Sequence, residues 1–73
     1  PALAAAGRDD AGRLQRLLAQ LPPPLQEVIR RRVYEGQRFR EIAADLGCPL
    51  NTALARMHEG LNRLRLLWGD DHA

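Results

Sequence analysis

The polar side chains with the clearest chemical use flank Gly47 in the middle of the chain. Six of them could contact nucleic acid: Arg38, Arg40, Asn51, Thr52, Arg56 and His58. Arginine presents a fork of N–H donors that fits phosphate and guanine, and asparagine can hydrogen-bond to a base edge. The alternative for each residue is an ordinary solvated side chain on the polar face of a helix.

Catalytic and metal-binding patterns are not found in the sequence. It offers no pair of carboxylates in a plausible cleft, no Cys/His dyad at useful spacing and no glycine-rich phosphate loop. Cys48 is the one cysteine, which rules out an internal disulfide, and His58 has no second ligand at suitable spacing. We therefore expect neither an enzyme nor a cofactor, and we expect Cys48 to be a small buried residue at a turn.

The composition is that of one small soluble domain. The chain has 73 residues, of which 45% are hydrophobic, and its formal net charge is +2. All eleven cationic residues are arginine, which reflects either codon bias or selection for phosphate and guanine contacts. No stretch approaches the roughly 18 apolar residues of a membrane span. We expect a cytoplasmic protein without a membrane partner and, because the chain starts at Pro1 without Met, a fragment of a longer one.

Proline and glycine divide the chain into helices. Asp9 or Asp10 can cap a first helix, which leucines at helical spacing continue until the prolines at 22–24 end it. The same prolines can open a second helix, which Gly36 closes in a left-handed conformation. Arginines 30–32 span too wide an arc to share one face, so at least one should pair with an acid such as Glu27 or Glu35.

Two further helices are predicted around Gly47. The third runs from about residue 38 to 46, and the last runs from 49 or 50 to about 68. The apolar stripe of the last helix is predicted to comprise Leu50, Ala53, Met57, Leu61, Leu64 and Trp68. Gly60 lies inside this helix, where close packing against another helix would explain it.

Two helices joined by a short glycine-containing turn form a helix-turn-helix, whose second helix can enter the major groove of DNA. We predict an all-α fold: a small helical bundle containing a helix-turn-helix, with an extra N-terminal linker helix.

From Leu21 to Arg65 the sequence resembles region 4 of bacterial extracytoplasmic-function (ECF) sigma factors. The resemblance depends on the order of short motifs: Leu21-Pro22-Pro23, Tyr34-Glu35-Gly36, Glu41-Ile42-Ala43, Leu46-Gly47-Cys48-Pro49, Asn51-Thr52 and Arg56-Met57-His58. It implies a linker and N-terminal helix at residues 1–20 and a region 4-like domain at residues 21–73. It also implies binding to the −35 element of promoter DNA while docked on the β flap of core RNA polymerase.

Three positions depart from that family. Leu54, Ala55 and Glu59 stand where many ECF sequences have a basic residue, serine and a second basic residue. Losing cationic contacts to phosphate lowers affinity for DNA. These departures motivate one alternative, a protein-interaction module with weak DNA binding. Another alternative is a helix-turn-helix domain of a different regulator, such as the response-regulator type, which shares the four-helix plan. Leu66 and Leu67 either pack on the N-terminal helix or form a docking surface for the polymerase flap, an anti-sigma factor or a second copy.

Overall fold

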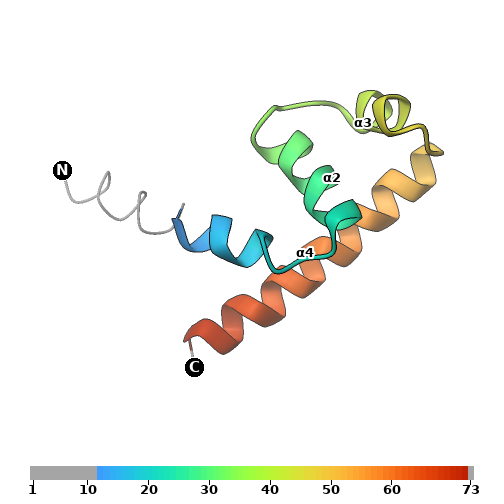
Figure 1. The fold of residues 1–73 in the computed structure, drawn as a ribbon. Coiled ribbons are helices and arrows are strands. Elements are labelled where there is room, and N and C mark those ends of the chain that lie inside the picture. The colour runs from blue at the N-terminus through green and yellow to red at the C-terminus, as the bar shows by residue number, and fades with distance from the viewer. Residues whose placement is uncertain (1–11, 73) are drawn as a thin grey trace.

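The computed structural model describes residues 12–72, and the side chains of residues 12–69. Helical turns over residues 12–18 are followed by α2 (Pro23–Val33), α3 (Phe39–Leu46) and α4 (Leu50–His72). In Figure 1, α2 and the helical turns before it lie against the long α4, and α3 lies near the start of α4. The all-α prediction is confirmed, while the predicted caps at Asp9 and Asp10 fall outside the described residues.

Proline opens α2 and glycine ends it. Pro22 is the N-cap and Pro23 the first helical residue, where the missing N–H has no helical partner to lose. After the helix Gly36 adopts a φ of 67°, and the N–H of Gln37 donates to the carbonyl of Arg31 at 3.0 Å. This left-handed closure confirms the role predicted for Gly36.

The turn between α3 and α4 is also closed by glycine. The backbone N–H of Arg38 donates to Glu41 Oε1 at 2.8 Å, which satisfies a free donor at the start of α3. Gly47 has a φ of 67° and its N–H reaches the carbonyls of Ala43 and Ala44. The last helix was predicted to end near Trp68, but α4 continues to His72, because residues 69–72 contain no proline and none of them adopts a left-handed conformation.

The core has two clusters that meet at Met57. The first joins the N-terminal segment, α2 and α4: Leu17, Leu18, Leu21, Leu25, Ile29 and Leu64. The second joins α2, α3 and the start of α4: Val28, Ile42, Ala43 and Ala53. Met57 packs against both, so α4 is the element on which the rest of the described chain is assembled.

The predicted apolar stripe of α4 is rotated from the face that the structure buries. Ala53, Gly60 and Leu64 are buried, whereas Leu50 and Leu61 are 38% and 43% exposed. A Cβ placed on Gly60 would lie 2.5 Å from Ile29 Cδ1, so α2 approaches α4 most closely at the glycine. The face of α4 that turns inward is therefore set by Gly60, which has no side chain, and not by the leucines. The prediction was wrong in assigning Leu50 and Leu61 to the buried face.

Candidate nucleic-acid interface

Polar side chains of α2 and α3 hold the helix-turn-helix in place. Asp45 Oδ2, near the end of α3, accepts from Arg31 Nη1 at 3.1 Å and from Gln37 Nε2 at 3.0 Å. Ile42 and Ala43 of α3 pack in the second cluster against Val28 of α2 and Ala53 of α4. The three helices therefore fix the direction in which the first turns of α4 project.

The start of α4 carries a shallow surface hollow. Its lining comprises Asn51, Thr52, Ala55, Arg56 and Glu59. Three predicted DNA contacts, Asn51, Thr52 and Arg56, are thus brought together on one face of the helix. Asn51 is exposed, and Thr52 and Arg56 are partly buried. Such a group at the N-terminal end of a second helix has the position that reads bases in helix-turn-helix proteins.

Arg56 and Glu59 give this hollow a mixed charge. Arg56 has no ion pair with any side chain that the structure describes, so its guanidinium is available to a ligand. Glu59 lines the same hollow and would repel a phosphate brought to Arg56. His58 is exposed and does not line the hollow. It lies about two turns beyond Asn51 on the same side of α4 and about 160° around the helix from Arg56.

Arg38 and Arg40 are exposed at the start of α3, where that helix would cross a DNA backbone. A third arginine, Arg32, was not predicted as part of this group. Its Nη1 donates to the carbonyl of Gln37 at 3.0 Å, and its guanidinium carbon lies 5.1 Å from the centre of the Phe39 ring. These contacts bring Arg32 from the end of α2 to the beginning of α3. The sequence did not indicate this contact, because Arg32 is distant from α3 along the chain and reaches it only after the left-handed turn at Gly36.

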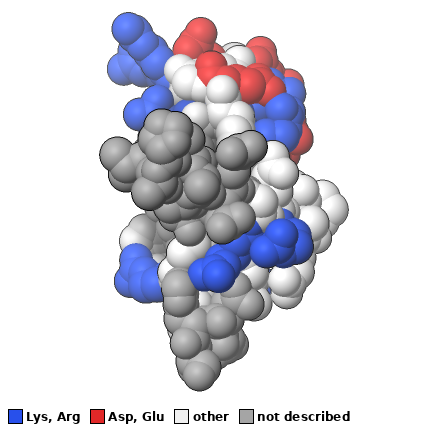
Figure 2. Space-filling view, turned by 90° about the vertical axis from the view of Figure 1, so that its left-hand side faces the viewer, with Lys and Arg blue, Asp and Glu red and all other residues white. Residues whose placement is uncertain are grey.

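Acidic residues neutralise the other two arginines of α2. Glu27 Oε1 accepts from Arg30 Nη2 and from Arg31 Nε, both at 2.7 Å, and Arg30 also pairs with Glu35. These two hydrogen bonds lower the pKa of Glu27, and the bonds to Glu27 and Glu35 raise the pKa of Arg30. The predicted pairing is confirmed. Figure 2 shows the acidic side chains gathered at one end of the molecule beside arginines, with further arginines at a distance from them.

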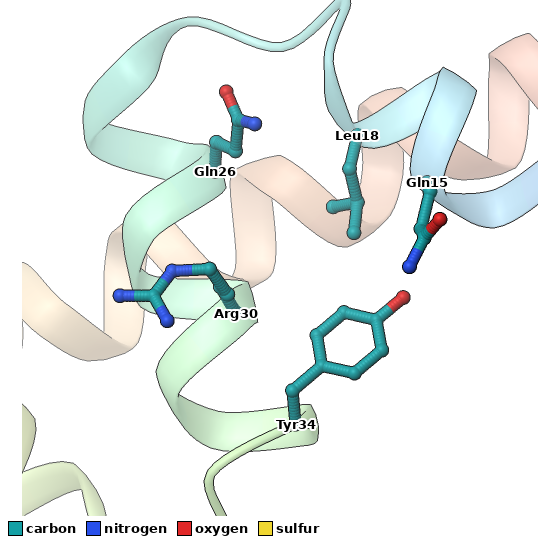
Figure 3. Close-up of a pocket in the computed structure, with 5 residues that line it drawn as sticks. All are labelled: Gln15, Leu18, Gln26, Arg30 and Tyr34. Carbon is teal, nitrogen blue, oxygen red and sulfur yellow. The ribbon is translucent and has the colours of Figure 1, made fainter.

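Two other hollows involve the N-terminal segment. The first is lined by Gln15, Leu18, Gln26, Arg30 and Tyr34. In Figure 3 the Tyr34 hydroxyl points toward the Gln15 amide and Arg30 points away from both. The hollow thus has amide, phenol and guanidinium groups without a carboxylate or imidazole among its lining residues, a set suited to hydrogen bonding.

Leu66 and Leu67 differ in their surroundings. Leu67 packs on the first core cluster, and Leu66 is 70% exposed. Both line the second of these hollows, together with Gln20, Leu21 and Arg63. The packing role therefore accounts for Leu67 alone, and docking at Leu66 stays a prediction.

Metal and membrane binding were also considered. Among residues 12–69, no three His, Cys, Asp or Glu side chains are grouped so that they could hold a metal ion. Over the same part of the chain, no helix has the length and apolar character needed to cross a bilayer.

Comparison with known proteins agrees with this geometry. Residues 11–64 match the protein-family model described as sigma-70, region 4. Over 58 residues the chain is 36% identical to the ECF RNA polymerase sigma factor RpoE of Cereibacter sphaeroides. The matched part is 80% of this chain and 32% of that relative, so the chain spans about a third of the relative's length. The chain therefore belongs to the sigma-70 region 4 family, as its resemblance to region 4 of ECF sigma factors from Leu21 to Arg65 predicted.

Proposed function

We propose that this domain recognises the −35 element of a promoter as part of a sigma factor that directs core RNA polymerase to initiate transcription. The observation that carries the proposal is the hollow at the start of α4, where Asn51, Thr52 and Arg56 share one face. Membership of the sigma-70 region 4 family supports the same role, and so does the similarity to an ECF RNA polymerase sigma factor. A protein with this role acts in the cytoplasm without chemistry of its own.

The recognition mechanism follows from the two helices on either side of Gly47. With the start of α4 in the major groove, Arg56 can donate two hydrogen bonds to a guanine edge or to a phosphate. Asn51 and Thr52 reach neighbouring base edges or phosphates from the first turn of the helix. Arg38 and Arg40 neutralise phosphates from the start of α3 and fix the register of the domain on the duplex.

Selection from a random duplex library, followed by fluorescence anisotropy with the enriched duplex, tests DNA recognition. We expect one enriched motif and weaker binding to a scrambled duplex of the same composition. Enrichment of no motif, together with equal affinity for both duplexes, would refute sequence-specific recognition.

Docking on the polymerase is tested separately by a pull-down of the isolated β flap with the intact factor. We expect the β flap to be retained by the factor. The absence of retention would refute polymerase docking and leave the DNA result standing.

A second candidate is a protein-interaction module with weak DNA binding. Glu59 in the hollow favours it, and so does Leu54, which is 41% exposed where a basic residue would contact DNA. The two candidates differ in the response to Arg56→Ala, which weakens DNA binding only if the hollow contacts DNA. The response-regulator type of helix-turn-helix is disfavoured by the match to sigma-70 region 4 over residues 11–64.

A further inference from the structure

The hollow at the start of α4 surrounds an apolar side chain, that of Ala55. Its other lining residues are Asn51, Thr52, Arg56 and Glu59, all of which have longer side chains than alanine. Asn51, Thr52 and Glu59 are separated from Ala55 by one helical turn, so they are its neighbours on the helix surface. Ala55 is itself exposed. A single accessible methyl group therefore lies between longer polar side chains.

The edges of the four bases differ in what they could place against this methyl group. In the major groove guanine, adenine and cytosine present only hydrogen-bonding groups, whereas thymine presents its C5-methyl group beside the O4 acceptor. The side chain of Ala55 has no donor or acceptor, so a polar base edge placed over it would lose hydrogen bonds to water without replacement. The methyl group of thymine has no such bonds to lose. Ala55 is therefore complementary to thymine.

We propose that Ala55 reads the C5-methyl group of a thymine in the DNA sequence that the domain recognises. Thr52 supplies a second methyl group to the same lining and supports the contact. The contact rests on the proposed function, because it requires the start of α4 to lie in the major groove. It adds a specificity-determining residue of a different kind from Arg56, since an apolar contact selects a base without a hydrogen bond and is not screened by salt.

The test starts from the duplex that selection enriches. Each of its thymines is replaced in turn by deoxyuridine, which keeps the base pairing and the O4 acceptor and lacks only the methyl group. We expect one position at which this replacement weakens binding about fourfold in fluorescence anisotropy, the effect of withdrawing one buried methyl-sized group. At the same position, 5-methylcytosine should bind more tightly than cytosine by a similar factor, because that pair differs in the same methyl group.

Ala55→Gly removes the protein's side of the contact. The ratio of affinities for the thymine and deoxyuridine duplexes should fall from about four to about one. Both affinities are measured on the same protein, so a smaller folded fraction lowers them equally and leaves the ratio unchanged. Leu54→Ala is the matched control, because Leu54 is an exposed apolar residue next to Ala55 that does not line the hollow. It should keep the fourfold ratio.

The outcomes separate this contact from the proposed function. An enriched motif without a fixed thymine would overturn the contact and leave sequence-specific recognition intact, and so would equal affinity for thymine and deoxyuridine at every position. A ratio that Ala55→Gly retains in full, or that Leu54→Ala abolishes, would place the methyl group against another residue and also overturn it. Enrichment of no motif would refute the proposed function and the contact together.

Discussion

Ile29 of α2 occupies the space that a side chain at residue 60 of α4 would need. A Cβ on Gly60 would lie 2.5 Å from Ile29 Cδ1 and 3.3 Å from Ile29 Cγ1. Ile29 is 1% exposed, so its side chain is enclosed and has little room to move away. This contact fixes the rotation of α4 against α2, and that rotation leaves the hollow and the side chains of Leu50 and Leu61 at the surface.

Gly60→Ala should therefore destabilise the domain even though alanine is the better helix former. Overpacking a core costs about 1–3 kcal/mol, and replacing a helical glycine returns about 1 kcal/mol. We expect a net loss of up to about 2 kcal/mol in the free energy of unfolding, measured by denaturant titration. Gly69→Ala, with nothing within 4 Å of its Cβ, is the control and should not destabilise the domain.

Ile29→Val gives a direct check of the same contact, because it removes the Cδ1 atom. Alone it should cost about 0.5–1.5 kcal/mol. Combined with Gly60→Ala it should cost less than the sum of the two, since the new methyl group fills the vacated space. Additive losses would show that the two residues do not compete for one volume.

The helix boundaries near the site were predictable from sequence because they are set locally. The prolines at 22 and 23 open α2, and Gly36 and Gly47 adopt left-handed conformations that close helices. Each effect depends on one residue type and its immediate neighbours. The hollow is predictable for a similar reason, since Thr52 and Arg56 are four residues apart on one helix.

The rotation of α4 and the position of Arg32 were not predictable in the same way. Leu61 is more hydrophobic than Gly60, yet Gly60 is buried and Leu61 is exposed, because the shape of Ile29 on another helix decides the outcome. Arg32 reaches Phe39 only after the chain turns at Gly36. Both depend on contacts between elements, which local periodicity does not encode.

The acidic side chain of Glu27 should make stability depend on pH. Hydrogen bonds from Arg30 and Arg31 lower the pKa of Glu27 from its usual 4.5. A carboxyl with a lowered pKa in the folded state stabilises the fold above its unfolded pKa, and this is lost as pH falls through the folded pKa. The unmodified chain should thus melt above Glu27→Gln at pH 7, and the two melting temperatures should converge as pH falls below about 4.5.

The difference between these two proteins should also shrink in high salt, because the pairs are partly exposed and screened. Thermal melts at several pH values, followed by circular dichroism, provide the measurement. A constant difference in melting temperature down to pH 3 would contradict a role for the ionised carboxylate.

Arg56 should be the most sensitive position of the hollow toward DNA. Arg56→Ala should weaken binding to the selected duplex by about 1–3 kcal/mol if the guanidinium reads a base. Arg63→Ala is the matched control, because Arg63 is an exposed arginine of α4 outside the hollow. Anisotropy titrations against the selected and scrambled duplexes measure both effects. If Arg56→Ala and the unmodified chain bind with equal affinity, the result would favour the other candidate function, a protein-interaction module with weak DNA binding.

Arg38 and Arg40 should contribute to affinity without contributing to sequence preference. Each phosphate contact adds about 0.9 to the slope of log K against log salt concentration. Arg38→Gln and Arg40→Gln should each reduce that slope by about this amount and weaken binding to both duplexes equally. A change in the selected motif, with the slope unaltered, would instead place the arginine at a base edge.

Glu59 should oppose DNA binding, and removing its charge should strengthen it. Glu59 lines the hollow with Arg56, so a phosphate or base drawn to the arginine also meets the carboxylate. Glu59→Gln should raise affinity for the duplex at low salt, with an effect that fades as salt screens the repulsion. Glu59→Arg should raise it further and steepen the salt dependence by about 0.9 if the new guanidinium reaches a phosphate.

The control for Glu59→Gln is Leu66→Lys, which changes the net charge by the same amount about two turns further along α4. Non-specific attraction between the chain and DNA would raise affinity equally in both variants. A gain confined to Glu59→Gln shows that the carboxylate acts from within the hollow. If Glu59→Gln instead weakens binding and changes the selected motif, the carboxylate accepts a hydrogen bond from a cytosine amine and belongs to the reading surface.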